Sequence, residues 1–416
     1  MEINQYNQQF FGARERERER EVKTSSELFS YKNLLKCYYE CRKKKRYTIN
    51  ALKFELHFET ELIKLRQELI THTYRPGQSI CFVVTKPKPR EIFAADFRDR
   101  IVHHVLVRYL ESIFEPKFID QSYACRKGKG AHRTIQDLVR YTRKVTKGNT
   151  RGAWYLQVDI QSFFVSLNKH VLLEQLRRHV KNPEILWLIE TIVLYNPTRN
   201  YYRKSQMSLF DLIPDHKSLF KVASDQGLPI GNLTSQFFAN VYLNDLDQFV
   251  KHTLKVKYYL RYVDDFLLLS NDKNELIKWR DEIVIFLQKK LKLKLHPKKQ
   301  VLQTIDKGID FVGFVVKPSH ILIRKRVIRS LKERLWIYNQ DKTIMDEEMM
   351  IKALSVINSY YGQFRHGNTF GLRSKLWRDD FGKLRDYMVP VDTNFSHFNI
   401  KGVIQPIRSI RPHQSI

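Results

Sequence analysis

The sequence predicts an α+β fold, with strands gathered in the middle of the chain and helices towards both ends. Runs of β-branched and aromatic residues indicate strands at residues 79–84 and 91–96, before Asp159, and in a hairpin at 257–270. Apolar residues at intervals of three and four predict helices between 26 and 72 and between 324 and 387. Of the 416 residues, 43% are hydrophobic, so the chain can bury one large core or several smaller ones.

The composition favours a polyanionic partner. Lys and Arg number 73 against 44 Asp and Glu, a formal net charge of +29, and phosphate backbones are the polyanion that suits this charge best. A membrane surface is the alternative, but no apolar run approaches the roughly 20 residues of a spanning helix, and no charged and then apolar leader opens the chain. We therefore expect a cytoplasmic protein without a membrane partner. Its four cysteines lack paired zinc spacing and fit a reducing compartment.

Residues 1–73 are expected to form an N-terminal helical arm. Within it, Arg and Glu alternate from 14 to 21 and would lie on every face of a helix, which predicts a solvated arm; an RNA-contacting arm is the alternative. A second charged run, CRKKKRYT at 41–48, is either a solvated helix end or a contact to phosphate, and the sequence leaves both open.

A basic hairpin follows the arm. A turn at 74–77 leads into the strands at 79–84 and 91–96, and the Pro-rich connection between them carries Lys86 and Arg90. Cations near this turn could face a triphosphate or a template phosphate. Further along, glycines in the segment 123–135 would let the backbone approach a ligand. The basic residues of that segment would supply charge: Arg126, Lys127, Lys129 and Arg133.

Three acidic residues stand where strands end. Asp264 and Asp265 lie at the turn of the hairpin KYYLRYVDDFLLLS, and Asp159 ends the strand in YLQVDIQSFF. A solvated Asp-Asp turn is the simplest interpretation of the pair alone. Carboxylates on neighbouring strand ends, however, are the hard oxygen ligands that Mg²⁺ needs. Two such ions, about 3.5–4 Å apart, can clamp the attacking and leaving oxygens of a phosphoryl transfer.

These acidic residues carry a resemblance to a known family. The Tyr-x-Asp-Asp hairpin at 262–265 and the Asp-x-x-x-x-aromatic strand at 159–164 resemble the active site of reverse transcriptases. The likeness extends over roughly residues 75–385. It implies a right-hand polymerase with fingers and palm at 74–318, an antiparallel palm sheet, a helical thumb at 319–388 and a C-terminal tail at 389–416.

The resemblance also implies a reaction and its participants. The protein would be an RNA-directed DNA polymerase that adds dNTPs to a 3′-hydroxyl by phosphoryl transfer with two Mg²⁺ ions, or Mn²⁺ in their place. An RNA template and a DNA product would be its partners. The aspartates would be catalytic, and the metal ligands would be Asp159, Ile160, Asp264 and Asp265.

The same resemblance assigns residues to the substrates. The nucleotide would contact Lys86, Arg90, Phe164, Ile230, Gly231 and Gln236. Arg90 would grip the triphosphate, and Phe164 would leave no room for a ribose 2′-hydroxyl, unless it only packs with Phe163 in the core. Either Lys298 or Lys299 would protonate the leaving pyrophosphate. The template and primer would contact Arg126, Lys127, Lys129, Arg133 and a hairpin that bends at Gly313.

The chain departs from the family pattern at 230–236. The family normally carries Gln-Gly-x-x-x-Ser-Pro there, whereas this sequence has Ile230 and Gln236 at the two ends. The form Gly-x-x-x-Ser-Gln resembles the enzymes of diversity-generating retroelements and of bacterial antiviral defence more than group II intron proteins. An apolar Ile230 can pack against a nascent base pair but cannot hydrogen-bond it.

Several biological roles stay open. A bacterial or phage retroelement, or an anti-phage defence system, would supply a cognate structured non-coding RNA. The alternatives are a defence enzyme that makes DNA without an ordinary template or with a protein primer, and an RNA-binding splicing cofactor of the intron maturase type. The sequence also leaves open an accessory protein, oligomerisation and the role of the irregular segment 196–225.

Overall fold

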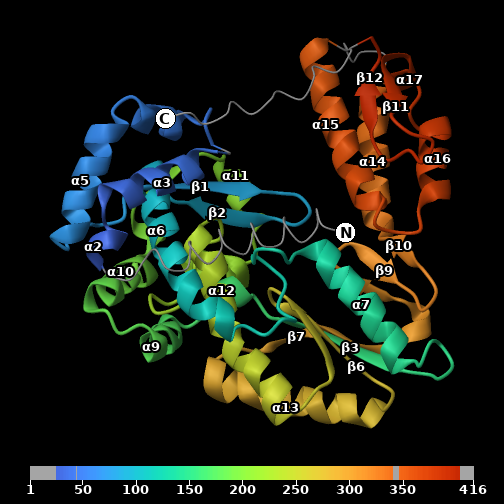
Figure 1. The fold of residues 1–416 in the computed structure, drawn as a ribbon, viewed down its shortest axis with the longest axis horizontal. Coiled ribbons are helices and arrows are strands. Elements are labelled where there is room, and N and C mark those ends of the chain that lie inside the picture. Colours follow the sequence, from blue (N-terminus) through green and yellow to red (C-terminus); the bar gives the residue numbers. More distant parts are fainter. Residues whose placement is uncertain (1–24, 44, 341–345, 403–416) are drawn as a thin grey trace, which may run out of the picture. The chain divides into compact units, whose positions relative to one another are not determined.

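The computed structural model describes residues 25–43, 45–340 and 346–402 (Figure 1). The Arg-Glu run at 14–21 and the end of the tail at 403–416 lie outside the described residues. The chain divides into two compact units. The first consists of Met1–Gly128, Leu156–Leu268 and Asn274–Val301, and the second of Lys129–Tyr155, Leu269–Lys273 and Leu302–Ile416. Neither unit is one continuous stretch, whereas the predicted boundaries at 73, 318 and 388 divide the chain into consecutive segments.

Helices open the first unit where the spacing of apolar residues predicted them: α2 (Ser25–Leu28), α3 (Tyr31–Arg42), α4 (Ile49–Glu55) and α5 (Phe58–Ile70). The Ser30 hydroxyl caps α3 by accepting a hydrogen bond from the Asn33 N–H. The buried face of α3 packs on α6 (Phe97–Phe114). The basic run at 41–48 begins in α3 and ends at the N-cap of α4, so both of its ends belong to these helices.

A three-stranded sheet follows. β1 (Ser79–Val84) and β2 (Arg90–Ala94) form the predicted antiparallel hairpin, and β4 (Tyr201–Arg203) pairs with β1 in parallel, which gives the order β2-β1-β4. Side chains of the hairpin alternate between its faces. One face joins a buried apolar cluster made of Cys81, Phe93, Val165 and Leu219. On the other face, Ile80, Phe82 and Ile92 stay half-buried.

The segment 196–225, which shows no periodicity in the sequence, is folded against this sheet. It contains η2 (Pro197–Arg199), β4, α11 (Met207–Phe210), η3 (Asp215–Lys217) and η4 (Leu219–Lys221). Elements of three or four residues are too short to produce a period, so a sequence pattern could not reveal them. The segment is therefore part of the sheet and its core.

Helices surround the centre of the first unit. α6 continues into η1 (Glu115–Lys117), and two further helices are α9 (Lys169–His179) and α10 (Pro183–Leu194). The second begins at Asn182, whose side chain accepts from two backbone N–H groups. α12 (Leu233–Gln248) is buried on most sides, contacts α6 and α9, and ends in the π-helical turn η5 (Phe249–Thr253).

A four-stranded sheet carries the acidic residues, and its strand order is β5-β6-β3-β7. The strands are β3 (Trp154–Ile160), β5 (Tyr258–Tyr262), β6 (Asp265–Ser270) and β7 (Leu295–Thr304). α8 (Phe163–Ser166) follows β3, and α13 (Lys273–Leu291) lies between β6 and β7 along the chain. The predicted hairpin and the predicted strand at Asp159 are confirmed, and with them the α+β fold class.

The second unit begins with α7 (Ala131–Val145) and continues after β7. Its small sheet has the order β10-β9-β8 and follows η6 (Ile305–Lys307): β8 (Ile309–Phe311), β9 (Phe314–Val316) and β10 (Ile321–Ile323). The predicted helices are α14 (Lys325–Tyr338), α15 (Glu347–Phe364), α16 (Phe370–Asp379) and α17 (Leu384–Tyr387).

The helical part of this unit continues past residue 388. β11 (Met388–Pro390) and β12 (Phe398–Ile400) form an antiparallel hairpin, and Phe398 packs with Tyr361, Trp377 and Phe381. The side chain of Asn358 in α15 also hydrogen-bonds both backbone groups of Phe398. The predicted tail at 389–416 therefore contributes its first residues to the core of the second unit.

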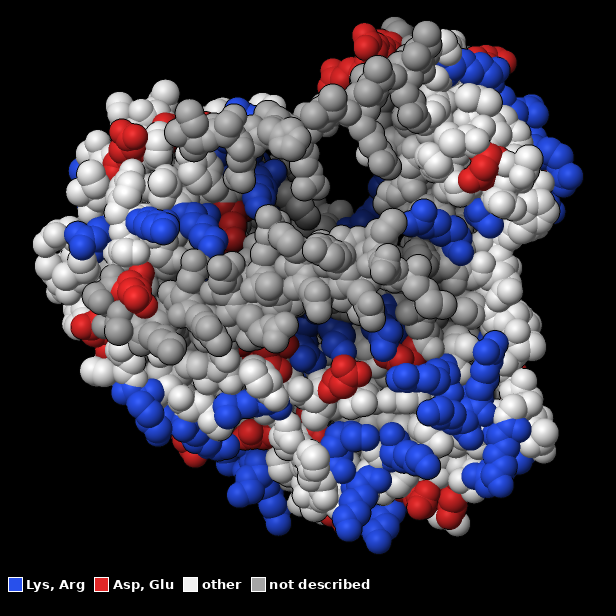
Figure 2. Space-filling view, viewed as in Figure 1, with Lys and Arg blue, Asp and Glu red and all other residues white. Residues whose placement is uncertain are grey.

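Within the described ranges, no helix is both long and apolar enough to cross a membrane. On the face drawn in Figure 2, Lys and Arg outnumber Asp and Glu and spread over much of the surface. Such a surface fits the predicted polyanionic partner.

Candidate active site

The turn between β5 and β6 carries the acidic pair. Val263 has a φ of 58°, in the left-handed region, so the chain reverses within two residues and β6 begins at Asp265. The backbone N–H of Ile160, at the end of β3, donates to the carbonyl oxygen of Asp264 (3.2 Å). Asp159 therefore lies beside the turn, and the three aspartates come from neighbouring strands of one sheet.

The carboxylates influence one another electrostatically. Burial and the negative charge of Asp159 raise the pKa of Asp264 to about 6. Burial raises the pKa of Asp265 to about 7, even though the Gln157 side-chain amide donates to both of its oxygens (3.1 and 3.2 Å) and opposes the shift. Such raised pKa values mean that nearby positive charge does not fully compensate the carboxylates. A bound cation would supply the missing charge.

Two of the predicted cationic residues act on these carboxylates. The Lys299 ammonium forms an ion pair with Asp159, and the charges of Lys299 and Arg90 both lower the pKa of Asp264. Lys298, the alternative proton donor, is exposed one position along β7. Of the two lysines, Lys299 is thus the one paired with a site aspartate.

The carboxylate side chains at this turn are of a chemical type that suits Mg²⁺. Three half-buried carboxylates are hard oxygen donors of the kind that Mg²⁺ prefers. Among the described residues, however, no three His, Cys, Asp or Glu side chains are grouped closely enough to hold a metal ion. The ammonium of Lys299 and the amide of Gln157 contact carboxylate oxygens instead. The aspartate side chains would have to turn away from these partners to bind a shared ion.

The two phenylalanines after β3 have different environments. Phe163 is 2% exposed and packs in the core, whereas Phe164 is half-buried. The backbone carbonyl of Phe164 accepts a hydrogen bond from the Leu228 N–H (2.8 Å), which fixes the residue beside the loop before α12. The alternative of plain core packing therefore holds for Phe163 and leaves Phe164 available as a pocket wall.

The loop before α12 is held on β2. The Phe93 N–H donates to the Ile230 carbonyl (3.0 Å), and the Ala95 N–H donates to the Asn232 side chain (2.9 Å). Between these bonds, Gly231 has a φ of 124°, and a Cβ there would lie 2.8 Å from the Ile92 side chain. Only glycine fits this position without strain. The predicted nucleotide residues of 230–231 are thus aligned with the strand that starts at Arg90.

Other predicted site residues are exposed to solvent. Lys86 is exposed in the β1–β2 connection, and Gln236 is exposed near the start of α12. Lys127 is 78% exposed and paired with Glu111 (2.8 Å), and its side chain is accessible to a ligand.

Arg126 does not have the freedom that a template contact requires. Its side chain is 8% exposed, and the guanidinium pairs with Glu115 (2.8 Å) and donates to the carbonyls of Ile119 and Ser122 (2.7 and 2.8 Å). Each of these contacts therefore joins Arg126 to another residue of the segment 115–126. A structural role describes Arg126 better than the predicted phosphate contact.

The remaining predicted contacts belong to the second unit. Lys129 lies just before α7, and Arg133, in α7, pairs with Asp137 (3.1 Å). Gly313 joins β8 to β9 with a φ of 88°, and a Cβ there would lie 2.8 Å from the Gln363 side-chain nitrogen. Its carbonyl accepts from the Arg324 N–H (3.1 Å). The bend predicted at Gly313 is confirmed.

Two polar residues that the sequence analysis missed support the site. One is Gln157, described above. The other is Glu91 in β2, which is 4% exposed and accepts hydrogen bonds from the Ser218 hydroxyl (3.0 Å) and the Leu219 N–H. It ties the segment 196–225 to the strand that begins at Arg90. Both are polar residues inside otherwise apolar strands, which is the signal that could have revealed them.

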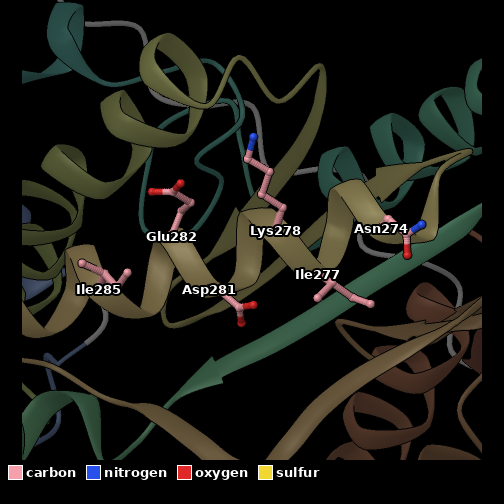
Figure 3. Close-up of a pocket in the computed structure, with 6 residues that line it drawn as sticks. All are labelled: Asn274, Ile277, Lys278, Asp281, Glu282 and Ile285. Carbon is pink, nitrogen blue, oxygen red and sulfur yellow. The ribbon is translucent and has the colours of Figure 1, made fainter.

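A separate hollow of about 400 Å³ lies along α13. Figure 3 shows that its lining residues all come from this one helix, with Lys278 and Glu282 on one side and Ile277 and Asp281 on the other. Because these side chains do not converge on a common point, the hollow offers no site for chemistry.

A group of strand-end carboxylates beside cations is typical of enzymes that transfer phosphoryl groups. Residues 84–316, more than half of the chain, match the family model described as reverse transcriptase (RNA-dependent DNA polymerase). The chain belongs to the reverse transcriptase family, as its motifs predicted, and with it to a class of RNA-directed DNA polymerases.

Curated relatives include bacterial proteins. Protein YkfC of Escherichia coli K12 is 25% identical over 312 residues, which cover 67% of this chain and 75% of that protein. The group II intron-encoded protein LtrA of Lactococcus lactis subsp. cremoris is 21% identical over 324 residues, which cover 62% of this chain and 50% of that protein. The chain therefore spans three quarters of one relative and half of the other. Among solved structures, an apo telomerase from Candida tropicalis aligns with a TM-score of 0.43 and 13% identity, covering 64% of this chain and 60% of that one.

Proposed function

We propose that this protein copies an RNA template into DNA by adding dNTPs to a primer 3′-hydroxyl, with Asp159, Asp264 and Asp265 as the catalytic residues. The observation that carries the proposal is the position of these carboxylates at the ends of the adjacent strands β3 and β6, with raised pKa values of Asp264 and Asp265 and the charge of Arg90 acting on Asp264. The family match supports the same reaction.

In the proposed reaction the 3′-hydroxyl attacks the α-phosphate and pyrophosphate leaves. Divalent cations held by the aspartates, with the backbone of Ile160 beside them, would neutralise charge on the attacking and leaving oxygens. Arg90 and Lys86 bind the triphosphate oxygens, and Lys299 gives a proton to the leaving pyrophosphate. Lys299 suits this role because its ammonium already lies at Asp159. Phe164 lies under the sugar, and Ile230, Gly231 and Gln236 border the nascent base pair.

A large cavity supports the proposal of a single-stranded template. It has a volume of about 1350 Å³ and an apolar floor from the outer face of the β1–β2 hairpin, including Ile80, Phe82 and Ile92. Cationic side chains from the α3–α4 region, from α6 and from the position after β4 also line the cavity: Lys43, Lys45, Lys53, Arg98, Arg100 and Lys204. Bases stack on apolar surfaces while cations neutralise phosphates. Gly231 also lines this cavity, so a template strand there would reach the proposed nucleotide pocket. Lys43 and Lys45 of the basic run at 41–48 then contact phosphate.

The direct test is primer extension by the purified full-length chain, with an RNA template, a DNA primer, dNTPs and Mg²⁺. DNA templates and omission of the primer are run in parallel, and Mn²⁺ replaces Mg²⁺ in a further set. Extension that requires the RNA template and a divalent cation supports the proposal. If no extension occurs under any of these conditions with folded protein, the proposed polymerase activity is wrong.

Template binding is expected to weaken steeply with salt, because Lys and Arg displace counterions from phosphates. Each neutralised phosphate contributes about 0.7 to the slope of log K against log salt for a single strand, and about 0.9 for duplex. Lys53→Ala should lower the slope for single-stranded RNA by about 0.7, because Lys53 lines the cavity.

Lys64→Ala is the matched control for the salt experiment. Lys64 lies in α5, the helix that follows that of Lys53. It is paired with Glu61 (3.0 Å) and does not line the cavity. Fluorescence anisotropy between low and physiological salt gives both slopes. A flat dependence for the unchanged protein, or equal slopes for Lys53→Ala and Lys64→Ala, would exclude this cavity as the binding surface.

We further propose that the protein serves a diversity-generating retroelement or an antiviral defence system and uses a cognate structured RNA. The Gly-x-x-x-Ser-Gln form at 231–236 supports this role. The similarity to LtrA supports the intron alternative, in which RNA binding for splicing is the main activity. A repeat pair with a variable target gene near the coding gene would favour diversification, and a lone operon with a structured RNA would favour defence.

Ile230→Gln is expected to raise copying fidelity by a factor near five. A glutamine side chain could hydrogen-bond the nascent pair, and one polar contact changes discrimination by about 1 kcal/mol. In the unchanged protein, errors should gather opposite template adenines if the role is diversification. Sequencing of cDNA from a mixed-base RNA template measures both effects, with Ile230→Val as the control that keeps the apolar contact. If glutamine leaves every error rate unchanged, Ile230 does not touch the nascent pair.

A further inference from the structure

Arg261 lies fully buried directly beneath the acidic turn. It belongs to β5, two residues before Val263, and both its side chain and that of its partner Asp247 have an exposed fraction of 0%. An arginine in the middle of an apolar strand is unusual, because burying a charge costs free energy unless the charge is paired and hydrogen-bonded. A buried ion pair of this kind is weak support for stability, so another reason for its presence is needed.

All five N–H donors of this guanidinium are used. Nε donates to Asp247 Oδ1 (2.8 Å), and Nη2 donates to Asp247 Oδ2 (2.6 Å) and to the Ser122 hydroxyl (2.9 Å). Nη1 donates to the Asn240 side-chain oxygen (3.3 Å) and to the carbonyl oxygen of Val263 (2.9 Å). A lysine has three donors without this planar arrangement and could not make the same set.

The hydrogen bond from Arg261 to the Val263 carbonyl oxygen holds the backbone of the turn. Val263 holds a φ of 58°, a conformation that is strained for a β-branched residue and persists only when its surroundings impose it. The peptide group before Asp264 is held by Arg261, and the peptide group after it is held by the Ile160 N–H (3.2 Å). The two anchors together define the direction in which the Asp264 side chain leaves the backbone.

The anchor itself is rigid because it joins several elements. Asp247 and Asn240 belong to α12, and Ser122 belongs to the segment before α7. The backbone of Arg261 is also bonded to that segment, donating to Gln121 (2.9 Å) and accepting from Tyr123 (3.0 Å). A guanidinium held at so many points can impose a strained conformation on the turn.

We propose that Arg261 is a positioning residue that holds the Val263–Asp264 peptide and thereby sets the direction in which the Asp264 carboxylate would bind a divalent cation, a role that rests on the polymerase function proposed above. Because its side chain is fully buried, Arg261 would reach neither substrate nor metal. Its effect passes through the left-handed conformation of Val263.

Arg261→Lys, alone and combined with Val263→Gly, tests this role. Arg261→Lys should weaken Mn²⁺ binding about 10- to 100-fold, as loss of a residue behind a metal ligand does, and slow primer extension by about 100-fold. Glycine adopts positive φ without strain, so adding Val263→Gly should restore part of both losses. Calorimetry of Mn²⁺ binding to protein without nucleic acid gives the affinity, and single-turnover extension gives the rate.

Tyr259→Phe is the matched control. The Tyr259 hydroxyl donates to Asp247 Oδ1 (2.8 Å), so its removal weakens the same buried network without touching the turn. It should lower the melting temperature while leaving Mn²⁺ affinity as it was. If Arg261→Lys does not fold by circular dichroism, Ser122→Ala carries the test, because it removes one guanidinium acceptor and should lower affinity and rate together.

The outcomes separate the two proposals. Equal loss of Mn²⁺ affinity in Tyr259→Phe and Arg261→Lys, or no recovery with Val263→Gly, shows that Arg261 only stabilises the fold and overturns the positioning role. A rate that falls in Ser122→Ala with unchanged affinity overturns it as well. If the unchanged protein binds Mn²⁺ but extends no primer, the polymerase proposal fails, while the affinity measurements still decide what Arg261 does.

Discussion

Replacing Asp264 or Asp159 with asparagine is expected to slow nucleotide incorporation by about a thousandfold or more, while RNA binding stays nearly the same. An amide is neutral and is a poor ligand for a hard divalent cation. Loss of about 4 kcal/mol of transition-state stabilisation corresponds to a thousandfold in rate. Neither aspartate can contribute favourable charge to phosphate binding, so the affinity for RNA should not fall.

Primer extension and filter binding on the same preparations measure these two effects. Asp281→Asn is the matched control, since Asp281 is 58% exposed on α13 and its replacement removes the same charge away from the turn. Asp281→Asn should extend primers at the same rate as the unsubstituted protein. Extension by Asp264→Asn and Asp159→Asn at the rate of Asp281→Asn would show that the acidic turn is not the catalytic centre.

Shortening Phe164 is expected to admit ribonucleotides. The half-buried ring would leave space for a 2′-hydroxyl after Phe164→Val or Phe164→Ala, because either substitution removes the outer part of the side chain. Steric and packing contacts of this size are worth about 1–3 kcal/mol, so the ratio of rNTP to dNTP incorporation should rise about 10- to 200-fold. Competition between ATP and dATP opposite template uridine measures the ratio.

Phe163→Leu separates this effect from a general loosening of the core. Phe163 is 2% exposed and packs beside Phe164 with ring centroids 5.3 Å apart, so its replacement should lower stability without changing sugar selection. An unchanged ratio in active Phe164→Val protein, or an equal rise in Phe163→Leu, would return Phe164 to a packing role.

Much of the site could be predicted from local sequence. Asp159, Asp264 and Asp265 each lie at or next to the end of a strand, and strands in one sheet bring such positions near one another. Gly313 marked a bend at which the backbone takes a positive φ, because few other residues tolerate it. The hairpins and the long helices were also recognisable, since their period repeats over enough residues to be read.

Other features depend on partners that are distant along the chain. β4 has three residues and is a strand only because β1 offers it backbone groups to pair with. Arg126 resembles a free cation in the sequence, but Glu115 and two carbonyls bind it. Lys298 and Lys299 could not be distinguished until Lys299 was found beside Asp159, 140 residues away.

The sequence by itself determined the family, the fold class and the positions of the three aspartates, because these follow from residue types and spacings within short segments. Only the tertiary structure decided how the aspartates are supported. The buried Arg261 network joins residues of β5, α12 and the segment before α7, and Glu91 joins β2 to residues more than a hundred positions later. Contacts between segments so far apart depend on how the elements pack, and no local pattern of residues encodes them.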